Sequence, residues 1–426
     1  MKVLFVTPVE DGSGETITSL HLAEGLTQKG HDVLFLASQF AARLLGDRFQ
    51  NQIRILGKDG PENHTLWDST LIEFTPDVVL FADYPLMFFG AGSVPLAFEP
   101  GWRESLDSLP MPLVTLDHFG FAQKEMGMFF GPPHLSFHYQ KFPPIPTQMQ
   151  ILLPCPMHEP MPVDGRRGDA VRYWNLPIEP PQASRAEVRS RFLSNPDDFL
   201  IFHSVPNWAC TQAERMGLFL YQHLGKILDY YLSDLPCPVT VVSVNNGGLL
   251  EAPANSRIRI VNLEPLSRPE FENLLFHSDL VMTENSVSIA MGKAICGLQP
   301  CCVLRNSFTF GQAVDRADGP IRDLVLEMED ERIGSIFPFN VYPIGMVQEL
   351  EQLILYQNNS LTAGFRPLEI FGGSATRQQL STLLTDSSER EALKAAQLEY
   401  VRRLEQIGDG AEVLEAIVDR AKSPVQ

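Results

Sequence analysis

The chain has 426 residues, of which 44% are hydrophobic and 20% charged, a composition typical of globular rather than disordered proteins. Its net charge of −19 repels phosphate backbones, and no basic patch offsets that charge, so we expect no nucleic-acid partner. No apolar run approaches the ~18 residues of a membrane span, and the first residues lack the apolar core of a signal peptide.

Strands and helices alternate along the first part of the chain. Residues 2–7 are a continuous apolar run, which predicts a strand buried on both faces. Apolar residues then recur at helical spacing from 17 to 26, and Lys29-Gly30 is a typical helix end. A strand at 32–38 completes a βαβ unit, which predicts a parallel sheet. Further strands are predicted at 52–56, 76–82 and 113–117, and a further helix at 67–75.

Residues 131–182 are rich in proline. We predict neither a helix nor a central strand here, because proline lacks a backbone N–H and clashes inside a helix. The segment is interpreted as an extended excursion that leads to a domain linker.

A second series of strands and helices follows. Its helices are predicted to begin at capping boxes such as Ser184…Glu187, and one is capped by Asn285 or Ser286. Strands are predicted at 198–204, 238–244, 257–262, 279–283 and 300–304, and tail helices at 378–384, 388–408 and 411–421. The fold class is therefore α/β, with two Rossmann-like, doubly wound domains and C-terminal helices. The expected domains are residues 1–180, 184–375 and 376–426.

Two stretches of the sequence resemble the GT-B glycosyltransferases. Residues 12–33 contain a glycine-rich turn, a Leu-Ala-x-x-Leu helix and a Gly-His-x-Val exit. Residues 278–300 contain an Asp-led apolar strand and then Lys-Ala-x-x-Gly-x-x-Pro, similar to the donor segment of that family. The resemblance implies two domains that face a cleft, with the acceptor bound mainly to the first and a nucleotide-sugar mainly to the second. The chain departs from the family pattern at Glu15, where many members have His, and at Lys293, where many have Glu.

The glycine-rich turn is the first candidate site. The backbone of this turn can approach a ligand closely, because it consists of small residues, Gly12, Ser13 and Gly14. The start of the helix that follows favours a negatively charged ligand. A plain tight turn is the alternative. Glu15 is a candidate general base for an acceptor hydroxyl or amine; otherwise it is a first-turn carboxylate that complements the helix dipole.

The donor segment holds the second candidate site. Asn285, Ser286 and Ser288 lie at a predicted helix start, where free backbone N–H groups can bind a diphosphate. Simple helix capping is the alternative. Lys293, about two turns further, is a candidate partner of a phosphate or of a sugar carboxylate, or else a solvated lysine.

Asp117 and His118 form a third candidate site, at the end of a first-half strand. Ligands of open α/β sheets bind outside the carboxyl ends of strands, so His118 is a second candidate base or acceptor-positioning group. A structural histidine is the alternative. No cluster has metal-ligand spacing, and no Asp-x-Asp follows an apolar strand, which favours a metal-independent donor site.

Together these features predict a cytoplasmic, metal-independent glycosyltransferase with Glu15 or His118 as general base. It would use a nucleotide-sugar as co-substrate, no cofactor, and a soluble small-molecule or protein acceptor; a homodimer is compatible with the sequence. The departures at Glu15 and Lys293 leave two alternatives open: an inactive GT-B-like binding or partner subunit, and a GT-B-like enzyme of different chemistry.

Overall fold

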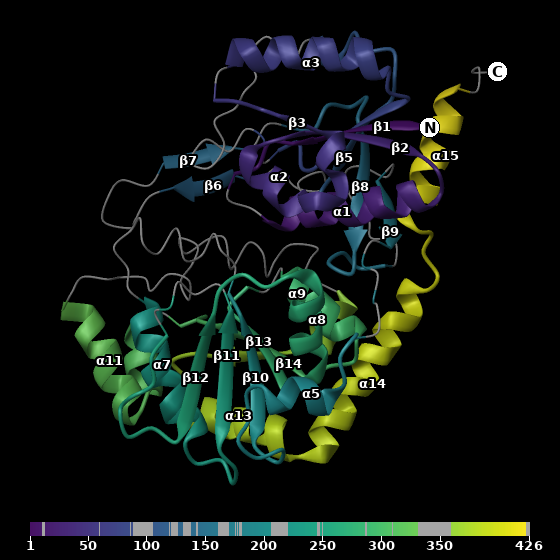
Figure 1. Ribbon diagram of the computed structural model, residues 1–426. Helices are drawn as coiled ribbons and strands as arrows, with labels where there is room; N and C mark the ends of the chain where they lie inside the picture. The colour runs from purple at the N-terminus through teal and green to yellow at the C-terminus, as the bar shows by residue number, and fades with distance from the viewer. Residues whose placement is uncertain are drawn as a thin grey trace.

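The computed structural model shows two α/β lobes stacked on one another, with the C-terminal helices along one side (Figure 1). It describes all residues except 11–12, 59, 86, 88–104, 119, 121–126, 131–137, 142–143, 161–169, 175, 177, 179–180, 206–219, 245–247, 249, 286–287, 309, 331–358 and 423–426.

The first lobe is built on a seven-stranded parallel sheet of order β3-β2-β1-β4-β5-β8-β9. Its strands are β1 (Lys2–Thr7), β2 (Asp32–Ala37), β3 (Ile53–Ile55), β4 (Val78–Phe81), β5 (Leu113–Leu116), β8 (Gln150–Cys155) and β9 (Val171–Trp174). Residues 3–6 of β1 are fully buried, because the sheet has a hydrophobic core on each face. The lobe also contains α1 (Ser13–Gln28), α2 (Gln39–Leu45), the 3₁₀ helix η1 (Gly46–Gln52), α3 (Gly60–Phe74) and the antiparallel pair β6 (Gly127–Phe130) and β7 (His138–Lys141).

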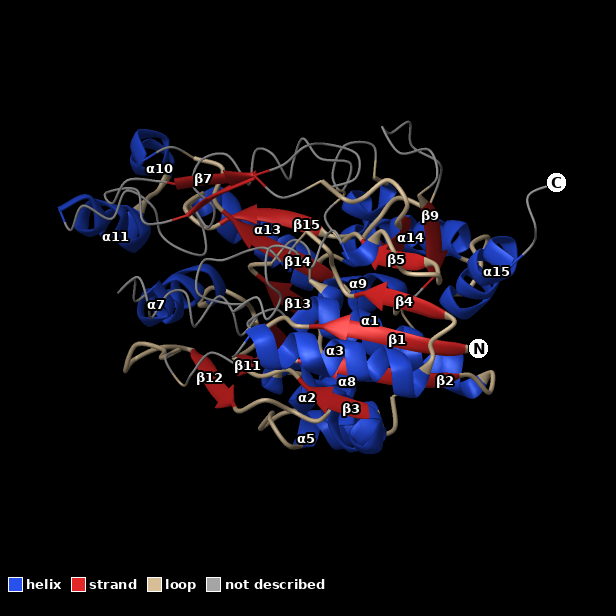
Figure 2. Ribbon diagram, turned by 90° about the horizontal axis from the view of Figure 1, so that it is seen from above, coloured by secondary structure: helices blue, strands red, loops and turns tan. Residues whose placement is uncertain are grey.

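The second lobe is built on a six-stranded parallel sheet of order β12-β11-β10-β13-β14-β15. Its strands are β10 (Phe199–Ser204), β11 (Val239–Val244), β12 (Ile258–Leu263), β13 (Leu280–Thr283), β14 (Cys301–Arg305) and β15 (Arg366–Glu369). Its helices are α5 (Arg185–Ser190), α7 (Leu220–Leu232), α8 (Arg268–His277), α9 (Ile289–Cys296), α10 (Phe310–Arg316) and α11 (Gly319–Asp330), with the 3₁₀ helix η3 (Ser360–Gly364). Figure 2, seen from above, shows the strands of both sheets flanked by helices.

Each sheet has one topological switch point, where the strand order reverses. In the first sheet this point lies between β1 and β4, and in the second between β10 and β13. Ligands of doubly wound sheets bind outside the carboxyl ends of the strands at such points. The two parallel sheets confirm the predicted α/β class with two doubly wound units.

The prediction that residues 131–182 contain no central strand is wrong. Within this range, β8 lies between β5 and β9 in the sheet. Its residues Ile151, Leu152 and Leu153 are buried and free of proline. Pairing with β5 ends at Leu152, two residues before Pro154, so the missing N–H of that proline removes no hydrogen bond to β5.

Two predicted helix starts also need correction. The helix expected at 67–75 begins at Gly60. The helix expected to be capped by Asn285 or Ser286 has Ser288 at its N-cap and begins at Ile289. In the latter case the chain turns once more before the helix, since the Ser288 N–H donates to the Asn285 carbonyl at 3.2 Å.

The tail helices join the two lobes. α13 (Ser374–Thr385) and α14 (Ser387–Leu404) pack on the second lobe, where Tyr400 and Leu404 enter its core. α15 (Gly410–Lys422) returns to the first lobe and buries Leu414 and Val418 in the core beside β9 (Figure 1). None of the described helices combines the length and apolar character that crossing a bilayer requires.

Candidate functional site

A stripe of buried polar side chains runs along α1. Glu15, Thr18, His21 and Glu24 recur every three residues and are each at most 8% exposed. Residues three apart are neighbours on a helix surface, and a strict three-residue spacing winds around the helix, so the two ends of this stripe face different surroundings. The first three line a pocket between the lobes, and Glu24 lines a second one.

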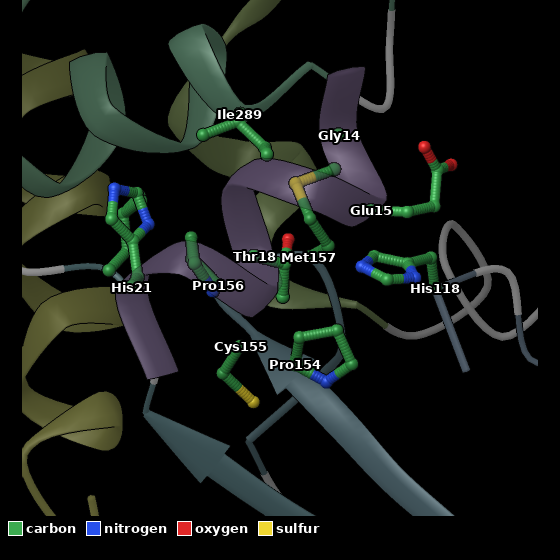
Figure 3. Close-up of a pocket in the computed structure, with 11 residues that line it drawn as sticks. Gly14, Glu15, Thr18, His21, His118, Pro154, Cys155, Pro156, Met157 and Ile289 are labelled. Atoms are coloured by element: carbon green, nitrogen blue, oxygen red, sulfur yellow. The ribbon is translucent and has the colours of Figure 1, made fainter. Parts of the chain in front are cut away.

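The first pocket lies where α1, the carboxyl end of β8 and the start of α9 meet. Figure 3 shows Glu15 and His118 at one end of the pocket and His21 at the other. Its remaining lining comes from small or apolar side chains: Gly14, Pro154, Cys155, Pro156, Met157, Leu176 and Ile289. Burial raises the pKa of the Cys155 thiol, so this residue is a neutral thiol rather than a nucleophile.

His118 and Asp83 form a buried pair behind the pocket. The His118 Nδ1 lies 3.3 Å from the Asp83 Oδ2, and the His118 backbone N–H donates to the same oxygen at 3.4 Å. Since a carboxylate only accepts, Nδ1 carries the proton and Nε2 carries the lone pair. That Nε2 is buried and has no partner among the residues that the structure describes. Burial lowers the pKa of His118, which favours the neutral imidazole, while Glu15 and Asp117 oppose this shift.

Glu15 is in a different electrostatic state. Burial raises the pKa of its carboxyl group above 4.5; His118 opposes this shift and Asp83 adds to it. Its Oε2 has no partner among the described residues. A raised pKa makes the ionised carboxylate a stronger base, so it does not by itself separate the two candidates. The geometry favours His118 as the base, because Asp83 orients its ring and leaves the Nε2 lone pair without a partner among the described residues.

Asp117 lies behind the pocket instead of lining it. Its side chain is fully buried and accepts from the Gly120 N–H at 2.9 Å. Its carbonyl accepts from the His158 Nε2 at 2.7 Å. Asp117 therefore orders the loop that carries His118.

His158 is buried and neutral. Burial lowers its pKa from 6.5 to about 3, because the charged ring would lose its hydration. The unfolded chain binds a proton below about pH 6.5 that folded His158 does not bind, so stability is lost as the pH falls. Between about pH 6.5 and pH 5 this residue alone is expected to cost about 2 kcal/mol. The test is urea unfolding at both pH values for wild type and for His158→Gln, which can still donate to Asp117. An unchanged pH dependence in the variant would contradict the assignment.

The N-termini of α1 and α9 approach each other at the pocket. A Cβ placed on Gly14 would lie 3.9 Å from the Ile289 Cδ1. Both helix starts direct the positive ends of their dipoles toward this region, which favours a negatively charged ligand. The enclosed space is about 60 Å³, room for a few water molecules, whereas a nucleotide needs several hundred. Among the described residues this pocket is therefore too small for a whole nucleotide.

The second pocket, of about 370 Å³, is lined by charged residues of both lobes. Glu24 of α1 accepts from Arg268 of α8 at 3.0 Å and from Arg48 at 2.5 Å. Arg268 also donates to Glu272 at 3.0 Å, and Glu272 accepts from Lys293 of α9. This charged cluster links the lobes behind the first pocket. It consists of Glu24, Arg48, Arg268, Glu272 and Lys293.

The structure brings together some of the sequence-predicted residues. Glu15, His118 and Gly14 line one pocket, and Asn285 and Ser288 precede α9, whose first residue, Ile289, lines it too. Gly12 and Ser286 lie outside the described residues, and so does the side chain of Ser13. The phosphate contact expected of Lys293 stays a prediction; in this structure its ammonium contacts Glu272.

Sequence reasoning missed Asp83 and His21. Asp83 follows the carboxyl end of β4 at the switch point, as Asp117 follows β5, so its position after a buried strand was a usable signal. His21 belongs to the three-residue polar stripe of α1, a pattern also visible in the sequence. Burial lowers the pKa of His21 to about 3, and Lys293, Arg268 and Arg48 add to this shift.

The sequence profile of one family matches most of the chain. Its description is "Family of unknown function (DUF6365)", and it matches residues 22–422. No curated protein matches the chain.

Solved structures with a similar fold include glycosyltransferases. The glycosyltransferase SnogD from Streptomyces nogalater is 14% identical, with 99% of each chain covered and a TM-score of 0.51. The glycosyltransferase VinC in complex with dTDP is 14% identical, with 99% of this chain and 100% of that chain covered and a TM-score of 0.53. The spinosyn rhamnosyltransferase SpnG complexed with thymidine diphosphate is 15% identical, with 98% and 100% covered and a TM-score of 0.50. At these identities the similarity shows the fold, and it confirms the GT-B fold expected from the sequence.

Proposed function

We propose a function for this chain, which belongs to DUF6365, a family of unknown function: it transfers a sugar from a nucleotide-activated donor to an acceptor hydroxyl or amine. The observation that carries the proposal is the unpartnered Nε2 of His118, held by Asp83 at a pocket where two helix N-termini meet. The GT-B fold, shared with glycosyltransferases that bind thymidine diphosphate, agrees with it.

His118 acts as the general base. Its Nε2 takes the proton of the acceptor O–H or N–H while the acceptor atom bonds to the anomeric carbon. The bond between that carbon and the diphosphate oxygen breaks, and its electron pair leaves with the nucleoside diphosphate. Asp83 holds the imidazole in the tautomer that leaves Nε2 free and stabilises the imidazolium that forms.

The leaving diphosphate is stabilised at the start of α9. Backbone N–H groups of the first turn of α9 and the dipoles of α9 and α1 offset its charge, and we propose that they do so in place of a metal ion. The donor enters when the lobes separate, and closure then excludes water from the small pocket. A soluble acceptor, a cytoplasmic location and a homodimer stay predictions from the sequence.

Nucleotide binding tests the proposal without knowledge of the sugar. UDP or TDP at about 100 times its Kd should raise the free energy of unfolding by about 2.7 kcal/mol. The measurement is thermal unfolding with UDP, TDP, inorganic phosphate and no ligand. A stabilisation by inorganic phosphate equal to that by both nucleotides would contradict a nucleotide site.

A binding subunit without activity is the second candidate, favoured by the departures from the family pattern at Glu15 and Lys293. It predicts nucleotide binding with no release of nucleoside diphosphate from UDP- or TDP-sugars. Mass spectrometry of the products would separate glycosyl transfer from a different GT-B chemistry such as epimerisation.

A further inference from the structure

A second group of buried polar side chains lies in the other lobe, on one face of its sheet. Ser243 of β11, His203 of β10 and Glu284 just after β13 come from three adjacent strands. His203 and Ser243 are fully buried, and the Glu284 side chain is 1% exposed. The group is therefore a buried row across the carboxyl edge of the sheet.

The hydrogen bonds of this row run in one direction. The Glu284 Oε1 accepts from the His203 Nε2 at 2.6 Å. With its proton on Nε2, the neutral ring accepts at Nδ1 from the Ser243 hydroxyl, 2.7 Å away. The second oxygen of Glu284, Oε2, is buried and has no partner among the described residues. The row thus ends in one unmatched acceptor.

Stability alone does not account for this row. Two residues earlier on the same strands, the same face of the sheet carries Ile201, Val241 and Met282, which are fully buried in the core. Continuing that apolar face would have avoided the cost of burying a carboxylate and two other polar side chains. An unmatched buried carboxylate oxygen costs more still.

The position of the row points to a ligand. His203 and Glu284 lie on opposite sides of the second switch point, between β10 and β13. Glu284 comes four residues before the N-cap of α9, where we place the diphosphate. A carboxylate repels phosphate, so its free oxygen suits a neutral group that carries a hydrogen to donate.

We infer that Glu284 binds an O–H or N–H donor of the nucleoside part of the ligand, and that His203 and Ser243 position its carboxylate. This inference rests on the proposed function, since it places a nucleotide in the second lobe. Two nucleoside groups supply the required chemistry: the ribose 2′-hydroxyl and the imide N–H of a base such as uracil.

Calorimetric titration with UDP, 2′-deoxy-UDP and CDP tests the inference and separates the two sources. In the Glu284→Gln variant the amide oxygen accepts the hydrogen bond from His203. The amide N–H group then faces the ligand in the place of the carboxylate oxygen. UDP binding should weaken at least tenfold in this variant. Binding of the nucleotide that lacks the contacted group should not weaken: 2′-deoxy-UDP for the ribose hydroxyl, and CDP for the imide N–H, since cytosine carries an acceptor at that position. Glu391→Gln, an exposed carboxylate of α14, is the control.

Positioning by His203 has a separate readout. His203→Gln can still donate to Glu284, so this variant should keep the preference for UDP over the nucleotide that lacks the contacted group. His203→Leu cannot donate and should lose this preference. An equal change for all three nucleotides in Glu284→Gln, or none, would overturn the inference while leaving the nucleotide site intact. If the wild-type protein binds none of the three and does not bind TDP either, the proposed function and this inference both fall.

Discussion

Replacing His118 with alanine should lower the rate of sugar transfer by roughly 10²–10⁴-fold, the usual contribution of a general base. Nucleotide binding should stay within about twofold, because we place the nucleotide on the second lobe and the base on the first. The measurement is the release of nucleoside diphosphate from UDP- and TDP-sugars, together with a nucleotide titration of the same protein. An unchanged rate in His118→Ala would contradict the assignment of the base.

Two further variants distinguish His118 from Glu15. Asp83→Asn should lose much of the rate, because an amide no longer fixes the imidazole tautomer or stabilises the imidazolium. Glu15→Gln is expected to lose less, since it keeps a polar side chain of the same size at the pocket and leaves His118 and its partner Asp83 in place. A larger loss in Glu15→Gln than in His118→Ala would reverse the two roles.

The pH dependence carries the same information. Burial lowers the pKa of His118 below 6.5, so the neutral base is the main form at pH 7 and is lost only as the pH falls below the lowered pKa. The rate should therefore be level near neutrality and fall on the acid side. That acid limb should persist in Glu15→Gln. Its disappearance in this variant would show that the limb belongs to Glu15.

Replacing Glu272 with alanine should lower the free energy of unfolding by about 3–5 kcal/mol, because it leaves the buried ammonium of Lys293 without its carboxylate. Lys293 is 5% exposed, and burial already lowers its pKa against the opposing effect of Glu272. Without Glu272 the ammonium loses its charge more easily, so the deficit should shrink as the pH rises. Denaturant unfolding at two pH values measures both effects.

Two controls test the physical reason. Combining Glu272→Gln with Lys293→Met removes both charges and should restore most of the stability. Glu389→Ala breaks a half-exposed pair with Arg366 and should cost less than about 1 kcal/mol. A deficit in the double variant as large as in Glu272→Ala would mean that packing, and not the unpaired charge, causes the loss.

The fold could be predicted well from the sequence because parallel strands buried on both faces are continuous apolar runs. The runs at 2–7 and 198–204 gave β1 and β10 to within a residue. β8 was missed because proline content was averaged over the whole segment, although residues 150–153 contain no proline. The start of α9 was misplaced because Asn285, Ser286 and Ser288 are all acceptable N-caps, and only tertiary packing selects Ser288.

The candidate site was predicted in part. The position of His118 after a predicted strand, and that of Glu15 after the glycine-rich turn, predicted both residues as candidate bases. Which carboxylate supports His118 could not be derived, since Asp83 and Asp117 both follow buried strands, and only the three-dimensional arrangement brings Asp83 to Nδ1. The polar row of the second lobe was also missed, because His203 and Ser243 lie near the ends of mainly apolar strands, where a polar residue does not alter the strand pattern.

The most direct test of the account is a crystal structure of the protein with UDP or TDP. The account predicts that the diphosphate lies at the backbone N–H groups of the first turn of α9, between the lobes, with the Nε2 of His118 on the opposite side of the ligand. A nucleotide bound outside the space between the lobes, or with its phosphates away from α9, would contradict the account.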